Sequence, residues 1–491
     1  MANLDNALIH PGLNEHLAAG RVLIMVLTHE EERLHRLLTA QARQLNVPLA
    51  TWTITSGLVI GEGKVEATRD PGQALAHLSA LGEEVLVWFK DLGHHYQPAV
   101  VRGLRDLYYR WLGSGSVVII SGPSMDIPLD LEREMGLLTL DMPSVGELLT
   151  EVNAWSADLE NRPEVETEVI AATLKGLTLT ESWHALTRVK NLAPSGAKML
   201  RLLQEEKRQL IQKSGTLEYI PDVPRIEDLG GLDYLKDWLV KRKKLLLDYD
   251  DASREIAPKG MLLMGVSGCG KSLCVKAVSS IWQLPLYRLE MVRIFSGAHG
   301  GPELAFANAC RLMEEMSPAI LWIDEIEMGL SGEGSSAADA TLSRIFAFFL
   351  TWMQEKPPGL FVAATANRID LLPAEMIRKG RFDQVFFVDL PTTSEREAIF
   401  QIHLEKRGFD PSQFNLEVFA DGTRGWNGAE IEQCVIAAIT NAKMEDRELE
   451  LKDLYASRRQ IVPISTTMEE QVRHIRNWAY DRAVRASPEA R

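Results

Sequence analysis

Apolar runs of strand length alternate with amphipathic segments over two long stretches of this chain, and a helical pattern follows each stretch. In the first stretch the apolar runs are short and bounded by turn residues, which is typical of strands buried between helices. This pattern predicts an α/β module with a mostly parallel sheet. The predicted strands cover residues 22–27, 49–54, 85–89, 117–121 and 137–140.

A helical pattern replaces the strand pattern at Pro143 and continues to about residue 214. Leu148, Val152 and Trp155 recur at spacings of three and four, as they would on one face of a helix. We therefore expect a small helical subdomain. The next segment places two prolines and a glycine pair ahead of a charged helix, which indicates a linker that leads into a further module.

A second α/β module is predicted from residue 260 onward, with strands at 261–264, 286–289, 319–323, 360–364 and 384–388. Helices return beyond Pro391, at 394–406, 429–443 and 468–486. The predicted organisation is an α/β module at 1–144, a helical subdomain at 145–214, a linker at 215–258, an α/β core at 259–391, and a helical lid with a C-terminal helix at 392–491.

The two halves of the chain share one plan, a sheet followed by helices, and this favours an internal duplication. An Ile-Pro-Leu turn at residues 127–129 and a later Pro143 parallel a Leu-Pro-Ala turn at 372–374 and a later Pro391. Two unrelated α/β domains with similar turns remain an alternative.

The composition disfavours several classes of protein function. The chain has 53 basic and 68 acidic residues and a net charge of -15, which disfavours binding to nucleic acid and to anionic membranes. No apolar run reaches the length of about 18 residues that a membrane span needs, and no export signal is recognisable. The four cysteines lack metal-ligand spacing. We expect a cytoplasmic protein without a membrane anchor.

A phosphate-binding loop is the most specific motif in the chain. The strand at 261–264 runs directly into a sequence that matches GxxxxGKS, and an amphipathic helix at 272–282 follows. Glycines allow successive amide hydrogens to face one phosphate, and the helix N-terminus favours the same anion. Lys271 would contact the β- and γ-phosphates of ATP, and Ser272 would ligate Mg²⁺. The predicted cofactor-binding residues are Gly265, Val266, Ser267, Gly268, Cys269, Gly270, Lys271 and Ser272.

Two acidic residues, Asp324 and Glu325, follow the strand at 319–323. The carboxyl edge of a parallel sheet is where α/β proteins bind ligands. We predict that Asp324 holds the magnesium ion through water and that Glu325 polarises the attacking water. Taken alone, such a pair is also typical of residues that cap a following helix.

A third strand leads into Asn367 and a segment that ends in Arg378, Lys379, Gly380 and Arg381. This run resembles the second region of homology of the AAA family of ATPases. Residues 228–232, 324–327 and 428–431 are similar to three further motifs of that family. The resemblance implies that Asn367 senses the γ-phosphate and that Arg378 and Arg381 are arginine fingers that act on a neighbouring subunit's nucleotide.

The same resemblance implies a homo-oligomeric ring, hexameric in the family, that acts on a protein client. The overall layout also resembles a poorly characterised branch of AAA proteins, which cyanobacteria and algal plastids encode as a hypothetical chloroplast reading frame. Proteins of that branch carry an N-terminal module without a phosphate loop. By this resemblance, residues 1–144 are a degenerate AAA-like domain.

Two departures from the family pattern limit the prediction. The stretch that matches the pore loop, from Ala298 to Glu303, lacks the aromatic residue with which unfoldases grip polypeptide, and Phe295 lies three residues too early. In the first module, acidic residues at 30–32 stand where a phosphate loop would belong. We interpret Lys90 and Asp91 as remnants of an acidic strand end, and the glycines at 57–63 as part of a hairpin.

The function that these residues favour is ATP hydrolysis with Mg²⁺, at one site per chain, to remodel or regulate a protein partner. Glu325, Lys271, Asn367, Arg378 and Arg381 are the predicted catalytic residues, and Ser272 and Asp324 the predicted metal ligands. A nucleotide-controlled adaptor or scaffold with slow hydrolysis is the alternative. A nucleic-acid motor or loader is a third hypothesis, which the net charge disfavours.

Overall fold

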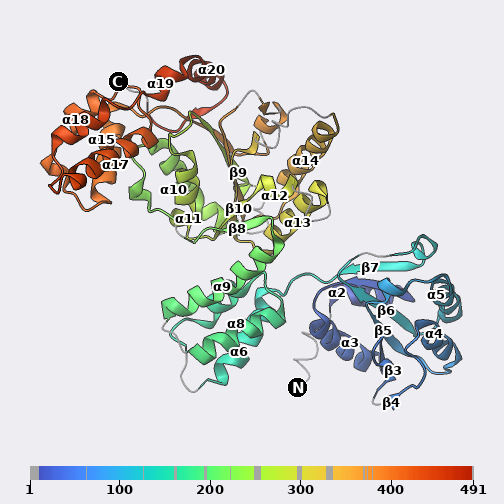
Figure 1. Ribbon diagram of the computed structural model, residues 1–491. Coiled ribbons are helices and arrows are strands. Elements are labelled where there is room, and N and C mark those ends of the chain that lie inside the picture. Colours follow the sequence, from blue (N-terminus) through green and yellow to red (C-terminus); the bar gives the residue numbers. More distant parts are fainter. Residues whose placement is uncertain are drawn as a thin grey trace. The chain divides into compact units, whose positions relative to one another are not determined.

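The structure is a computed structural model (Figure 1), and it describes residues 10–61, 63–124, 127–159, 163–192, 196–221, 223–247, 256–295, 301–327, 336–368, 371–372, 374–378 and 380–488. The chain divides into two compact units, residues 1–204 and 205–491. Each unit is built around its own α/β sheet.

The sheet of the first unit has seven strands in the order β4-β3-β2-β5-β6-β1-β7. The five predicted strands are confirmed, and they pair in parallel. The predicted hairpin is also confirmed, because β3 and β4 pair antiparallel at one edge. The strands are β1 (Leu23–Leu27), β2 (Leu49–Thr53), β3 (Gly57–Ile60), β4 (Gly63–Lys64), β5 (Leu86–Lys90), β6 (Val117–Gly122) and β7 (Met135–Thr139).

Helices cover both faces of this sheet because successive strand residues point to opposite sides. In β5, Leu86 and Trp88 face one core, which α2 (Pro11–Ala18) and α3 (Glu31–Leu45) complete. Val87 and Phe89 face the other core, together with α4 (Pro71–Ala80) and α5 (Pro98–Trp111).

The helical subdomain follows the first sheet, as predicted. It consists of α6 (Val145–Ala157), α7 (Thr167–Leu174), α8 (Leu179–Leu192) and α9 (Gly196–Ser214). Leu148, Ile170 and Leu186 are buried in its own core. The last helix, α9, contains the boundary between the two units, which falls after Gln204.

The sheet of the second unit also has seven strands, in the order β14-β13-β9-β12-β11-β10-β8. Its five predicted strands are confirmed and pair in parallel. The strands are β8 (Leu217–Tyr219), β9 (Gly260–Gly265), β10 (Leu286–Leu289), β11 (Ala319–Ile323), β12 (Leu360–Ala366), β13 (Gln384–Val388) and β14 (Val484–Arg485).

One face of this sheet packs against α10 (Asp233–Leu247) and α11 (Lys271–Trp282). The other face packs against α12 (Met291–Phe295), α13 (Pro302–Glu315), α14 (Ser336–Glu355) and α20 (Glu469–Tyr480). The lid has a separate core and contains α15 (Thr393–Glu405), α16 (Leu416–Asp421), α17 (Gly428–Met444) and α18 (Leu451–Arg458), and the short α19 (Ile464–Thr467) comes next.

Two sheet edges differ from the prediction. The segment predicted as a linker contributes an edge strand, because β8 pairs antiparallel with β10. The predicted tail helix at 468–486 is too long, since α20 ends at Tyr480 and β14 then pairs with β13. The carbonyl of Ala486 also accepts the backbone N–H groups of Tyr234 and Leu235 at the start of α10. These first N–H groups have no partner within α10, and the extended tail supplies one.

The two sheets share one topology. The order β7-β1-β6-β5-β2 of the first unit corresponds to β13-β9-β12-β11-β10 in the second. In both sheets the last of these five strands in the sequence lies beside the first, and the fourth, third and second follow. The strand ends match as well, since Asp91 after β5 and Glu325 after β11 both adopt a left-handed backbone conformation. This correspondence favours duplication over two unrelated α/β domains.

Candidate nucleotide-binding site

The glycine-rich loop joins β9 to α11, as the motif predicts. Gly265 has a φ of 145°, and a Cβ atom there would lie 2.0 Å from the carbonyl oxygen of Val388 on the neighbouring strand β13. Gly268 has a φ of 77°, and a Cβ atom there would lie 2.5 Å from Nδ2 of Asn427 in the lid. Only glycine fits this backbone and these close approaches.

The loop ends in Gly270, which is the N-cap of α11 and has no side chain to accept the first amide hydrogens. These donors and the positive end of the helix dipole make the N-terminus of α11 suited to an anion. The Cys269 thiol adds no negative charge beside it, because burial raises its pKa to about 12.

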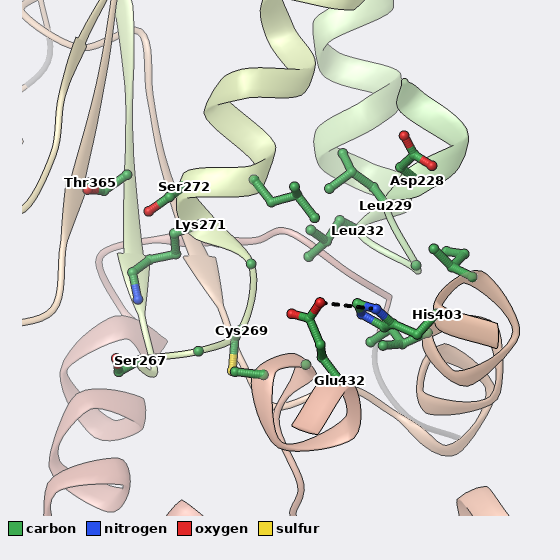
Figure 2. Close-up of a pocket in the computed structure, with 18 of the residues that line it drawn as sticks. Asp228, Leu229, Leu232, Ser267, Cys269, Lys271, Ser272, Thr365, His403 and Glu432 are labelled. Carbon is green, nitrogen blue, oxygen red and sulfur yellow. Dashed lines mark ion pairs between the residues drawn. The ribbon is translucent and has the colours of Figure 1, made fainter. Parts of the chain in front are cut away.

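Lys271 is the buried cation of the loop, with 6% of its surface exposed. Its Nζ donates hydrogen bonds of 2.9 Å to the carbonyl oxygens of Gly265 and Val266. Burial lowers its pKa, and the nearby Glu327, Glu325 and Asp324 act in the opposite direction. The ammonium group therefore has two carbonyl partners, and Figure 2 shows Lys271 beside Ser272 in the loop.

A hydroxyl and carboxylate cluster lies at the carboxyl ends of β11 and β12. Ser272 Oγ donates to Asp324 Oδ1 at 3.3 Å, and Thr365 Oγ1 donates to the same oxygen at 2.6 Å. Thr365 Oγ1 also accepts the backbone N–H of Glu325 at 2.9 Å. The predicted metal ligands Ser272 and Asp324 are thus brought together. Thr365 is a site residue that the sequence reasoning did not single out.

The predicted water-polarising residue and the predicted sensor are direct partners. Asn367 Nδ2 donates to Glu325 Oε1 at 2.7 Å. The loop that carries Asn367 is held by Glu327, whose carboxylate accepts the backbone N–H groups of Asn367 at 2.5 Å and Arg368 at 3.0 Å. Glu327 is 2% exposed, and burial raises its pKa.

The lid contacts the loop through the first turn of α17. Asn427 Nδ2 donates to the carbonyl of Ser267 at 3.0 Å, and the backbone N–H of Ala429 donates to the carbonyl of Gly268 at 3.1 Å. Asn427 is also the N-cap of α17 and forms a capping box with Glu430. These two hydrogen bonds hold the start of α17 against the phosphate loop.

A pocket of about 400 Å³ opens over these residues. One end is formed by the loop together with Asp324, Glu325, Thr365 and Asn367. The rest of the lining comes from three separate segments: Asp228, Leu229, Gly230, Leu232, Ile399, Ile402, His403, Lys406, Gly428, Ala429 and Glu432. Sequence reasoning missed His403 and Glu432, although their spacing of four from Ile399 and Gly428 places each pair on one helix face.

The predicted arginine fingers are not brought to this pocket. Arg378 is exposed, and Arg381 Nη1 donates to the carbonyl oxygen of Glu375 in the same segment. Neither side chain lines the pocket of its own chain. The predicted pore-loop positions Ala298, His299 and Gly300 lie outside the described residues, and Phe295 packs against the core of the second unit.

Comparison with known proteins decides the family. Residues 261–390 match the profile of the ATPase family associated with various cellular activities (AAA), and residues 9–140 match that of the N-terminal domain of SpoVK-like AAA ATPases. The AAA domain-containing protein ycf46 of Pyropia yezoensis is 36% identical over 475 residues, which cover 94% of this chain and 95% of that protein. This chain belongs to the AAA family.

Further AAA relatives cover different shares of the chain. The ycf46 protein of Guillardia theta is 33% identical over 471 residues, 94% of this chain and 93% of its own length. A cell division cycle protein 48 homologue of Archaeoglobus fulgidus is 26% identical over 350 residues, 65% of this chain and 48% of its own length. The AAA chain therefore resembles the ycf46 proteins along almost its whole length.

The first AAA unit has a buried ion pair where the second has its phosphate loop. Glu30, after β1, accepts the backbone N–H of Leu179 at 2.7 Å and pairs with Arg33 at 2.9 Å. Burial raises the pKa of Glu30. Lys90, interpreted as a remnant of an acidic strand end, pairs with Glu31 at 2.9 Å. These contacts occupy the turn with carboxylates, which repel phosphate.

Two features are absent from the described residues. Within them, no helix is both long and apolar enough to cross a bilayer. The same residues hold no group of three or more His, Cys, Asp or Glu side chains that could by itself coordinate a metal ion. A magnesium ion at Ser272 and Asp324 would take its remaining ligands from water and phosphate, as this ion does in nucleotide sites.

Proposed function

We propose that the chain hydrolyses ATP with Mg²⁺ at the single site formed by β9, α11, β11, β12 and the lid. One observation carries the proposal: the hydroxyls of Ser272 and Thr365 and the carboxylate of Asp324 meet beside an uncapped helix N-terminus. A triphosphate needs amide donors and a cation at one end of the site, and a metal-binding oxygen cluster beside them. Membership of the AAA family supports the same reading.

Binding would use the loop residues 265–272. The amide groups of the loop and of the first turn of α11 would hold the phosphates, and Lys271 would exchange its carbonyl partners for phosphate oxygens. Ser272 and Asp324 would hold Mg²⁺, whose chemistry is to neutralise charge that develops on the phosphate oxygens.

Hydrolysis needs a base that orients water, and we propose Glu325 for this role. Its carboxylate lines the pocket and accepts a hydrogen bond of 2.7 Å from Asn367 Nδ2. Asn367 would act as the sensor, because an amide that binds either Glu325 or a γ-phosphate oxygen can report which partner is present.

The arginines imply assembly. Arg378 is exposed and neither arginine lines the pocket of its own chain, which supports a role for Arg378 and Arg381 at a neighbour's nucleotide. An arginine supplied from another subunit can neutralise charge on the γ-phosphoryl group only when the subunits are docked. AAA proteins commonly form oligomeric rings, and we propose a homo-oligomer, hexameric as in the family, that remodels or regulates a protein client.

The test of the chemistry is Glu325→Gln. This variant should bind ATP normally and hydrolyse it at least about a hundredfold more slowly, because the amide cannot accept a proton. Steady-state phosphate release and retention of bound ATP after gel filtration measure the two effects. Wild-type turnover by the variant would contradict the assignment of Glu325.

The test of assembly uses mixed subunits. Arg378→Ala should lose turnover while it still binds ATP, and mixing it with Glu325→Gln should restore part of the turnover, since a finger from one chain then meets an intact site in the other. Arg424→Ala, in the lid, is the control and should turn over ATP like the wild type. Failure of every mixture to regain activity would argue against fingers in trans.

An adaptor or scaffold with slow hydrolysis is the second candidate. The first unit favours it, because Glu30 and Arg33 occupy the turn where a nucleotide would bind and leave that unit's exposed surface for partners. Turnover measured with and without proteins captured by the ATP-bound Glu325→Gln variant separates the two candidates. A remodelling enzyme should be stimulated by its client, whereas an adaptor should stay slow.

A further inference from the structure

The pocket has an apolar and a polar part beyond the phosphate loop. Leu229 and Leu232 face it from the segment before α10, and Ile399 and Ile402 from α15. Such a lining suits a flat, largely apolar group such as a nucleobase. Two carboxylates line the pocket away from the loop: Asp228, which pairs with Lys406 at 3.6 Å, and Glu432 on α17.

The position of Glu432 follows from the contact between the lid and the loop. The first turn of α17 touches the loop, where the N–H of Ala429 donates to Gly268 at 3.1 Å. Gly428 and Glu432 both line the pocket and are one helical turn apart, which corresponds to a rise of about 6 Å. A residue one turn further from the loop would meet the part of the nucleotide next to its phosphates, which is the sugar.

The carboxylate of Glu432 has spare capacity for a donor. Arg407 Nη2 donates to Oε1 at 2.9 Å, and His403 Nδ1 lies 3.6 Å from the same oxygen. The side chain remains 44% exposed, and Figure 2 shows it next to the His403 ring in the pocket. An ionised carboxylate accepts about four hydrogen bonds and donates none. It would repel phosphate, so the ligand group that it suits is a neutral donor.

The guanidinium group of Arg407 determines which nitrogen of His403 carries the proton. Arg407 Nη1 lies 3.2 Å from His403 Nδ1, and a guanidinium group can only donate. His403 Nδ1 is therefore the acceptor, and the neutral ring carries its proton on Nε2. Burial lowers the pKa of His403, which favours the same neutral form. Of the three residues His403, Arg407 and Glu432, only Glu432 therefore offers the pocket a negatively charged hydrogen-bond acceptor.

We propose that Glu432 recognises the 2′-hydroxyl group of the sugar and makes the site selective for ribonucleotides over 2′-deoxyribonucleotides. Acidic side chains hold ribose hydroxyls in the same way in dinucleotide-binding folds. The proposal rests on the proposed ATP-binding function and adds the class of nucleotide that the site accepts. The competing reading is that Glu432 only fastens Arg407 between α15 and α17.

Affinities of the full-length protein for ATP and 2′-deoxy-ATP, measured by calorimetry with Mg²⁺, test the proposal. Glu325→Gln should serve as the parent in all samples, so that hydrolysis does not disturb the titrations. The parent should prefer ATP by about tenfold, the effect of one hydrogen bond to a charged group. Glu432→Ala should weaken ATP binding about tenfold, leave 2′-deoxy-ATP binding within about twofold, and so remove the preference.

Arg407→Met is the matched control. It breaks the ion pair but keeps the carboxylate, so the preference for ATP should persist. Equal affinities in the parent, or an unchanged preference in Glu432→Ala, would overturn the proposal while the proposed ATP binding stands. Loss of the preference in Arg407→Met with its retention in Glu432→Ala would also overturn it. If the parent binds neither nucleotide, the proposed function itself fails and the selectivity falls with it.

Discussion

Single buried charges set how the stability of this chain depends on pH. Lys356, directly after α14, is 8% exposed, and its Nζ donates to the carbonyl oxygen of Leu360. Burial lowers its pKa from 10.5 to about 7, and the nearby Asp383 offsets only part of that effect. Between these two values the unfolded chain holds a proton that the folded chain has lost. The contribution of Lys356 to stability therefore increases as the pH rises through this window.

Lys356→Met should remove this pH dependence and stabilise the second unit most at low pH. We expect a gain on the order of 1 to 3 kcal/mol near pH 6 and a smaller one near pH 9, because the charged form is the one that burial penalises. Urea unfolding at both pH values measures it. The control is Lys244→Met, because Lys244 is exposed on α10 and its replacement should leave the pH dependence of stability unchanged. Wild-type and Lys356→Met curves with the same pH slope would contradict the prediction.

At the scale of elements, α8 of the helical subdomain and α17 of the lid begin at equivalent places in the two units. The turn Gly425-Trp426-Asn427 begins α17 beside the phosphate loop, and Gly176-Leu177-Thr178 begins α8 beside Glu30. Gly176 and Gly425 have φ angles of 88° and 84°, and Thr178 and Asn427 pair with glutamates three residues later. The Glu30 carboxylate accepts the backbone N–H of Leu179, the first residue of α8, where the second unit would have a phosphate group as the acceptor.

Glu30→Ala should destabilise the first unit by about 1 to 3 kcal/mol, because it leaves the N–H of Leu179 without an acceptor and leaves Arg33 with Glu147 as its remaining carboxylate partner. Hydrogen exchange in the first turn of α8 and chemical unfolding measure the effect. The matched change is Glu31→Ala, which breaks an exposed pair with Lys90 and should cost less than about 0.5 kcal/mol. Equal effects of the two changes would refute the special role of Glu30.

At the scale of the whole molecule, each unit has its own sheet and its own cores. Only the second unit carries a phosphate loop, so a nucleotide should stabilise the two units unequally. With Mg²⁺ and ATP at about a hundred times the dissociation constant, the Glu325→Gln protein should gain about 2.7 kcal/mol in the second unit.

Hydrogen exchange resolved by peptide measures this gain. Protection should appear in β9, α11 and α17, and strands β1 to β7 should exchange as before. Lys271→Ala should abolish the protection, and Lys241→Ala, on the exposed face of α10, should leave it intact. Equal protection of both units would show that the nucleotide also binds or restrains the first.

Local patterns in the sequence were enough to predict the central strands, the helical regions and the phosphate loop. A buried strand is a contiguous apolar run, and the loop motif is contiguous because one turn of backbone surrounds one phosphate. Asp324 and Glu325 were also predictable, since they directly follow such a strand.

The tertiary structure alone decided what depends on distant pairing. Strands β8 and β14 are three and two residues long and are defined by the strands beside them. Thr365 joins the site through Asp324, 41 residues away, and Glu432 meets His403 from another helix. Periodicity records which face of an element is buried, whereas a hydrogen bond between remote side chains leaves no spacing in the sequence. The chemistry of the loop could therefore be predicted from the sequence, and the residues that enclose the ligand could not.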